Sequence, residues 1–104
     1  MAEQDASGVF KALADPTRRD ILEMLRDGEC SAGEIAGQFD MAAPSVSRHL
    51  ALLKAAQLVE DRREGNRIFY SLSEERLAHV LGQFMSAVCP TQLARKVRRK
   101  KGKR

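Results

Sequence analysis

The sequence has no tryptophan, four phenylalanines, one tyrosine and only two cysteines among its 104 residues. Two cysteines are too few for a disulfide scaffold, so a hydrophobic core has to hold the fold together. No apolar stretch approaches the roughly 20 residues that a membrane helix needs, and the opening "MAEQDASG" is polar and acidic, unlike a signal peptide. These absences predict a cytoplasmic protein that inserts no segment into a membrane.

Patterns that carry catalysis are also missing. The sequence has no glycine-rich phosphate loop, no cluster of metal ligands, and no serine, histidine and aspartate set at a catalytic spacing. The two histidines, His49 and His79, fall in different predicted helices, and no carboxylate spacing marks either of them. We therefore expect no enzyme activity and no cofactor.

Length and charge describe one small domain with a basic end. A chain of 104 residues with 43% apolar composition can build one core but not two. The net charge of +4 comes from residues 95–104, "RKVRRKKGKR", which hold eight of the 18 cations and no acid. Residues 1–94 then carry ten cations against 14 acids, so a nucleic-acid surface on the body has to come from local clustering of cations.

Apolar spacing and capping residues predict three helices in the first 40 residues. The first is expected over "SGVFKALA" (residues 7–14). In the second, "DPTRRDILEMLRDG", Asp15 stands at the N-cap and Pro16 at the first helical position, and Gly28 is expected to stop it. The third opens with Ser31 and Glu34 at the spacing of a capping box.

A fourth helix is predicted over "APSVSRHLALLKAAQ" (residues 43–57). Val46, Leu50 and Leu53 recur at i, i+4 and i+7 and should face the core. Arg48 then projects from nearly the opposite side, among short side chains. Two short helices joined by a tight connection, the second with a polar outer face, form the helix-turn-helix pattern, whose second helix enters the DNA major groove.

The rest of the chain is predicted to form a hairpin and a final helix. The stretch "LVEDRREGNRIFYSL" (residues 58–72) has strand composition on either side of Gly65 and Asn66, which predicts a two-stranded hairpin with a basic tip. A helix should follow from Ser73 as far as Pro90. Its apolar stripe is long for so small a domain, so we expect it to cover a partner subunit in a two-fold dimer. The stripe consists of Leu77, Val80, Leu81, Phe84, Met85 and Val88.

The segments "FKALADPTRRDILEMLRDGE", "SVSRHLALLKAAQLV" and "DRREGNRIFYSL" resemble the ArsR-type winged-helix repressors, most of all their SdpR-like autorepressor branch. The resemblance covers residues 8–88. It implies a mainly α fold of about five helices with a small two-stranded wing, and a homodimer formed through the first and last helices. Residues 1–90 would be the DNA-binding and dimerisation domain, and residues 91–104 a flexible basic tail. Val9, Phe10 and Leu13 of the first helix would join the dimer interface.

The same resemblance implies which residues contact double-stranded DNA. The recognition-helix candidates are Pro44, Ser45, Ser47, Arg48 and His49, and the wing candidates are Arg62, Arg63, Asn66 and Arg67. Arg48 could pair bidentately with a guanine, and the serines could anchor phosphates. His49 leans back toward the buried stripe, so packing and a phosphate contact both stay open for it. Many relatives carry a serine where this chain has Ala42, so the helix lacks that N-cap.

Metal sensing of the kind found in this family is not expected here. Ser31 and Gly33 match the positions of the two thiols in the arsenic- and cadmium-type members. The ligand positions of the zinc-type members match Glu74, Arg76, Ala87 and Pro90, and an arginine, an alanine and a proline cannot build the tetrahedral site that zinc prefers. A thiol switch stays open as an alternative. Cys89 resembles the carboxyl-terminal cysteine of persulfide-sensing relatives, but their second thiol falls near Glu23, and Cys30 lies about two turns later.

The sequence predicts a homodimeric transcriptional repressor that blocks promoter access in the nucleoid, with autorepression of its own promoter among the expected roles. It specifies no effector. One alternative is a winged-helix module that binds proteins without reading DNA. Another is an RNA-binding protein that uses its tail, although the aromatic residues that would stack on bases are predicted to lie in the core. The basic tail is either a solubilising segment or a DNA arm that adds phosphate contacts.

Overall fold

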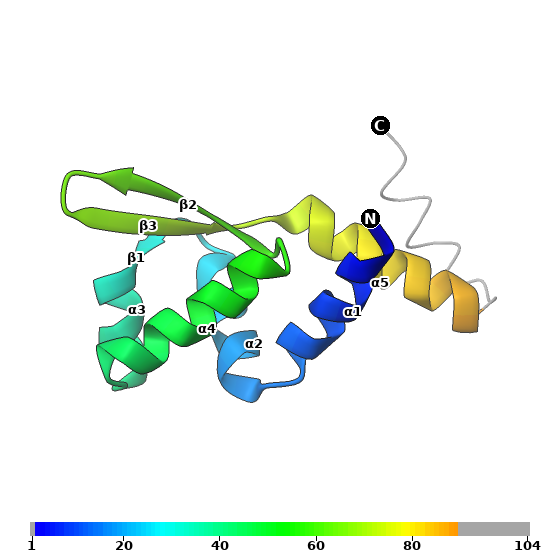
Figure 1. Cartoon of the computed structure of the whole chain (residues 1–104), viewed down its shortest axis with the longest axis horizontal. Helices are drawn as coiled ribbons and strands as arrows, with labels where there is room; N and C mark the ends of the chain where they lie inside the picture. The colour runs from blue at the N-terminus through cyan, green and yellow to red at the C-terminus, as the bar shows by residue number, and fades with distance from the viewer. Residues whose placement is uncertain (1, 90–104) are drawn as a thin grey trace. The chain divides into compact units, whose positions relative to one another are not determined.

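The computed structural model describes residues 2–89, with side chains from Ser7 onward, and the predicted basic tail at 91–104 lies outside this range. The described residues form two units, divided between Ser73 and Glu74. The first unit runs in the order α1 (Ala2–Leu13), α2 (Pro16–Leu25), β1 (Cys30–Ser31), α3 (Ala32–Phe39), α4 (Ala43–Ala55), β2 (Val59–Glu64) and β3 (Arg67–Leu72) (Figure 1). In the second unit the described part is α5 (Glu74–Val88) followed by Cys89.

The predicted caps are present at the second and third helices. The Asp15 carboxylate accepts hydrogen bonds from the backbone N–H groups of Thr17 (2.9 Å) and Arg18 (3.1 Å), and Pro16 opens α2. At α3, the Ser31 hydroxyl accepts from the Glu34 N–H and the Glu34 carboxylate accepts from the Ser31 N–H, so the capping box is confirmed. These caps place both helix starts as the sequence predicts.

Helix α1 starts earlier than predicted. It begins at Ala2, five residues before the "SGVFKALA" segment. The added residues, "AEQDA", are mostly good helix formers, but they have no apolar periodicity from which a start could be predicted.

Helix α4 ends in a Schellman motif, two residues before the predicted end at Gln57. The N–H of Leu58 donates to the Leu53 carbonyl (3.0 Å) and the N–H of Gln57 donates to the Lys54 carbonyl (2.9 Å). Gln57 takes the left-handed conformation, φ 65°, that glycine usually supplies at this position. The chain therefore reverses directly from α4 into β2.

The wing has three strands rather than the predicted two. Strand β3 lies between β1 and β2, and both pairings are antiparallel. The third strand is only two residues long, so it had no alternation from which it could be predicted. Its register places Ser31 opposite Phe69. The hairpin between β2 and β3 turns at Gly65 and Asn66, as predicted. Gly65 has a φ of 63°, a left-handed conformation that favours glycine.

The core of the first unit joins the helices to the base of the wing. Residues buried there include Val9 of α1, Ile21 of α2, Ile35 of α3 and Leu58 ahead of β2. The predicted α4 stripe of Val46, Leu50 and Leu53 is buried at 2% exposure or less. Because this stripe fixes the rotation of α4, it determines which α4 residues face outward.

Several residues predicted to form the dimer interface lie at the surface of the chain. Phe10 is 38% exposed, Phe84 49% and Val88 55%. The prediction that all five aromatic residues lie in the core is therefore wrong: Phe10 and Phe84 are exposed, and Phe39, Phe69 and Tyr70 are only half-buried. Val9 and Val80 are already buried within the chain, so any dimer surface depends on the exposed members of the set.

Candidate nucleic-acid interface

Helices α3 and α4 form the helix-turn-helix. Helix α3 ends at Phe39. The next residue, Asp40, is its C-cap and reverses the chain in a left-handed conformation (φ 52°), and α4 begins three residues after Asp40. The helix start has no side-chain cap, since Ala42 occupies the N-cap position, as predicted from the sequence. The first turn of α4 therefore has N–H groups that only the backbone or an outside acceptor can satisfy.

Three of the five recognition-helix candidates are exposed. Pro44, Ser47 and Arg48 lie on the outer side of α4, and Ser45 and His49 are half-buried. Within the described residues Arg48 makes no hydrogen bond or ion pair, so its guanidinium keeps all five donors for another molecule. A planar fork of donors on a helix face lined with short side chains suits a guanine edge.

His49 is turned toward the protein. Its ring nitrogen Nδ1 lies 3.3 Å from Nη1 of Arg18, a residue of α2. The same arginine donates to the carbonyls of Ala12 (2.8 Å) and Lys11 (3.1 Å) at the end of α1. Arg18 thus connects three helices, and His49 is the residue of α4 that it contacts.

The wing arginines face opposite sides of the sheet. Side chains alternate along a strand, so Arg63 shares a face with Asp61, and Arg62 lies on the other face. Asp61 forms an ion pair with Lys54 of α4, with 3.0 Å between Nζ and the carboxylate oxygen. Arg63 therefore lies on the side of the sheet that α4 contacts, and within the described residues it has no ion pair of its own.

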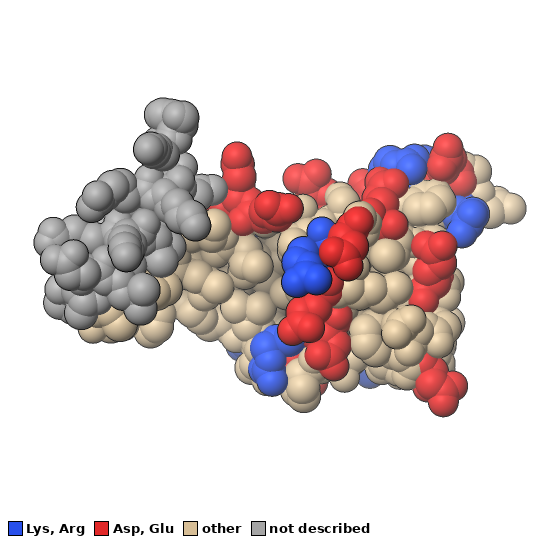
Figure 2. Space-filling model, turned by 180° about the vertical axis from the view of Figure 1, so that it is seen from behind, with Lys and Arg blue, Asp and Glu red and all other residues tan. Residues whose placement is uncertain are grey.

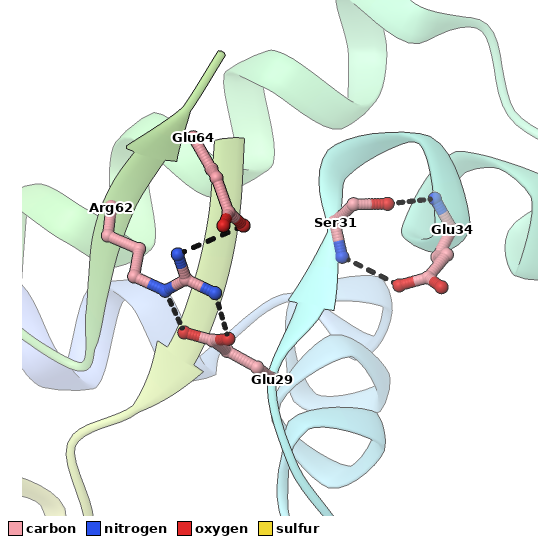
Figure 3. Close-up of polar contacts among 5 residues, drawn as sticks. All are labelled: Glu29, Ser31, Glu34, Arg62 and Glu64. Carbon is pink, nitrogen blue, oxygen red and sulfur yellow. Dashed lines mark hydrogen bonds and ion pairs between the residues drawn. The ribbon is translucent and has the colours of Figure 1, made fainter. Parts of the chain in front are cut away.

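Arg62 is held by acidic residues. Its Nε and Nη2 donate to the two carboxylate oxygens of Glu29 at 2.8 and 2.9 Å, and Nη1 donates to Glu64 at 3.2 Å (Figure 3). The hydrogen bond from Arg62 lowers the pKa of Glu29, and the two carboxylates raise the pKa of Arg62. In this bidentate pair the Glu29 carboxylate neutralises the positive charge of Arg62, the charge that a contact with a DNA phosphate would need.

Arg62 and Arg67 both stack on Phe69, whose ring centroid lies 4.7 Å from the first guanidinium carbon and 5.0 Å from the second. Arg67 and Asn66 are exposed at the tip of the wing. The stack holds Arg67 beside the sheet but leaves its nitrogens able to donate. The wing therefore offers Arg63, Arg67 and Asn66 to an outside molecule more readily than Arg62.

The cysteines lie in different units. Cys30 is in β1, where its thiol donates to the Gly28 carbonyl at 3.7 Å, and Cys89 follows α5. Burial, assisted by the Glu34 carboxylate, raises the pKa of the Cys30 thiol. A raised pKa reduces the thiolate that a redox sensor needs, so it disfavours Cys30 in that role.

No group of three or more potential metal ligands occurs among the described residues. Ser31, at one of the family's thiol positions, has the structural role of capping α3. Within residues 2–89 no helix is long and apolar enough to span a bilayer. On the face seen from behind Figure 1, acidic side chains form patches among uncharged residues, and fewer cations are visible (Figure 2).

The sequence did not point to Arg18 or Glu29 as parts of this region. Each of the two acts through a partner far along the chain: Arg18 through His49 and Glu29 through Arg62. The one available signal was the run "DPTRR", which carries a cation directly behind a predicted helix N-cap.

Comparison with known proteins agrees with this geometry. The family model of a helix-turn-helix domain matches residues 13–62. Over 67 residues, 64% of this chain and 74% of the relative, the sequence is 49% identical to the transcriptional repressor SdpR of Bacillus subtilis. Over 80 residues, 77% of each chain, it is 34% identical to the arsenical resistance operon repressor of Staphylococcus xylosus.

Solved structures show the same fold. A crystal structure of an ArsR family transcriptional regulator superposes with a TM-score of 0.75 at 29% identity, over 82% of this chain and 87% of the other. HlyU from Vibrio cholerae superposes with a TM-score of 0.67 at 34% identity, over 85% of this chain and 96% of the other. The protein is therefore a winged helix-turn-helix transcriptional regulator. It belongs to the ArsR family, and within that family it is SdpR-like.

Proposed function

We propose that the protein is a homodimeric repressor that reads an operator through α4 and the wing and blocks access to a promoter, its own among the candidates. The observation that carries this proposal is the exposed guanidinium of Arg48 on the outer face of α4, with Arg63 on the side of the sheet that α4 contacts. Arg48 would contact a guanine edge in the major groove. Arg63 and Arg67 would contact phosphates or the minor groove beside it.

The family supports repression and a non-enzymatic role. Two of its relatives above are named as repressors, and the fold is one that regulators share. The dimer is supported by the exposed apolar side chains Phe10, Phe84 and Val88 on α1 and α5. In a two-fold dimer, two copies of α4 would read two half-sites about one helical turn apart. Such a protein would work in the cytoplasm at the nucleoid.

The basic residues at 95–104 are proposed to act as a DNA arm. Eight cations in ten residues would add phosphate contacts that carry no sequence information. The body holds more acids than cations, so the arm would supply much of the long-range attraction to DNA.

The test is fluorescence anisotropy with duplex DNA from upstream of the protein's own gene and with a scrambled duplex, over several salt concentrations. The full chain is compared with a full-length variant whose eight tail cations are replaced by serine. We expect preference for the upstream duplex by about a thousandfold or more, retained in the variant with a flatter salt dependence. Equal binding to both duplexes that disappears with the tail charges would contradict operator reading by α4.

A further inference from the structure

Arg18 of α2 contacts two other helices, α1 and α4, through a single side chain. Its Nε and Nη2 donate to carbonyls at the carboxyl end of α1, and its Nη1 lies 3.3 Å from His49 Nδ1 on α4. Within the described residues it forms no ion pair, and the two carbonyls that it binds belong to the negative end of the α1 dipole. The arginine therefore ties the recognition helix to α1 and α2.

The contact with His49 fixes the chemistry of the imidazole ring. A guanidinium can only donate hydrogen bonds, so Nδ1 of His49 has to be the acceptor. An acceptor nitrogen carries no proton, which excludes the doubly protonated imidazolium while the contact lasts. The proton of the neutral ring then sits on Nε2, on the far side of the ring from Arg18.

The position of His49 on α4 makes this remaining N–H useful. His49 follows Ser45 by four residues, so the two half-buried side chains share one flank of the helix, between the buried stripe and the exposed side that carries Arg48. This flank borders the face proposed to enter the major groove, where the nearest DNA groups are backbone phosphates.

We propose that Arg18 is a positioning residue that holds His49 as the Nε2–H tautomer, so that His49 donates one hydrogen bond to a single phosphate of the operator. The proposal rests on the proposed function, since it requires α4 to dock on DNA. It gives His49 the phosphate role rather than a packing role alone. The phosphate contact would fix the register of α4 in the groove, and Arg48 would then read the base.

The test is a coupling experiment on the full chain with operator duplexes that each carry one methylphosphonate, which removes the charge of one phosphate. His49→Asn keeps a polar atom near the Nδ1 position but has no distal donor, and Arg18→Lys keeps the charge but not the fork. Arg48→Ala is the matched control on the same helix. Thermal melts confirm that each variant is folded.

We expect His49→Asn to weaken operator binding about tenfold, the effect of losing a hydrogen bond to a charged group. One methylphosphonate position should weaken the unaltered chain and the Arg48→Ala variant, yet leave the His49→Asn variant unchanged. Arg18→Lys should reduce the effect of that same position. Nitrogen-15 NMR of the unaltered chain should show the proton of His49 on Nε2, and a mixture of tautomers in Arg18→Lys.

Any of three results would overturn the proposal. The His49→Asn variant could bind the operator as tightly as the unaltered chain, or the two proteins could respond identically to every methylphosphonate position. Either result would show that His49 is a packing residue without a phosphate contact. A proton found on Nδ1 would show that this nitrogen does not accept a hydrogen bond from Arg18, so Arg18 could not set the tautomer. These outcomes differ from failure of the proposed function, in which the unaltered chain would not prefer the operator and Arg48→Ala would change nothing.

Discussion

Two adjacent arginines in the wing have different environments. Arg62 is bound by Glu29 and Glu64 and stacks on Phe69, whereas Arg63 lies on the opposite face of the sheet near the contact between α4 and β2. In the sequence they are equivalent members of one basic run. Their separation depends on strand alternation and on an acid 33 residues upstream, so only the register of the sheet distinguishes them.

Replacing each wing arginine by alanine should therefore have different effects. Arg63→Ala should weaken operator binding and lower the slope of log affinity against log salt by about 0.9, the effect of losing one phosphate contact. Arg62→Ala should leave that slope unchanged and lower the melting temperature, because Glu29 and Glu64 lose their partner. Anisotropy titrations at several salt concentrations check the slopes, and Arg26→Ala, an exposed arginine of the α2 C-cap, is the control. A slope reduced equally by Arg62→Ala would show that this residue contacts DNA.

The Asp15 carboxylate makes the stability of the folded chain depend on pH in the acid range. Although desolvation opposes it, hydrogen bonds from the backbone N–H groups of Arg18 and Thr17 lower the pKa of Asp15. Because the pKa is lower in the folded state, the carboxylate contributes stability above its unfolded pKa, near 4, and this is lost as pH falls.

Asp15→Asn keeps a side-chain oxygen at the N-cap but removes the titration. We expect urea unfolding of this variant to depend less on pH between about pH 5 and pH 2 than unfolding of the unaltered chain. Asp27→Asn, at an exposed acid that forms an ion pair with Arg26, is the matched control. A pH dependence identical to that of the unaltered chain would exclude Asp15 as a source of acid sensitivity.

At the scale of elements, caps and stripes were the predictable features, and short or non-periodic segments were not. The α4 stripe, the Asp15 cap and the Ser31–Glu34 capping box are present as the sequence indicates, because each depends on residues within two turns of a helix. The early start of α1 and the third strand escaped prediction. The first lacks apolar periodicity, and the second exists only because β3 lies beside it.

The uncapped start of α4 predicts a stabilising substitution. Ala42→Ser would place a hydroxyl where it can accept from the N–H groups of the first turn, which should raise the free energy of unfolding by about 0.5–1 kcal/mol. Hydrogen exchange at the first-turn amides of α4 should slow in parallel. Ala43→Ser is the control, because the first helical residue lies past the capping position. Equal stabilisation by both serines would show that the cap is not the cause.

At the scale of the whole molecule, the chain has an uneven distribution of charge and apolar side chains at its surface. The cations at 95–104 outweigh a body that is formally −4, and α5 presents Phe84 and Val88 to the surface. Composition was enough to predict both properties. It could not show which members of the apolar stripe are already covered, since that depends on how the chain packs on itself, as for Val80.

A charge on α5 should separate dimerisation from folding. Phe84→Glu should convert the proposed dimer to a monomer in sedimentation experiments. Operator affinity should then fall by about a hundredfold or more, because two linked half-site contacts become one. Gln83→Glu, at the neighbouring exposed position, adds the same charge and should leave both properties unchanged. A dimer that persists in Phe84→Glu would exclude this part of α5 from the interface.

Ser31 belongs to two elements at once, as the last residue of β1 and the N-cap of α3. The wing and the helix-turn-helix are therefore joined without a linker, and neither can tilt without moving the other. On DNA, such a joint would keep a constant distance between the bases that α4 contacts and the phosphates that the wing tip contacts. Each base pair advances the duplex by about 3.4 Å, so one inserted base pair would leave one of the two contacts out of reach. The operators of this protein should therefore tolerate substitutions within a half-site better than changes in its length.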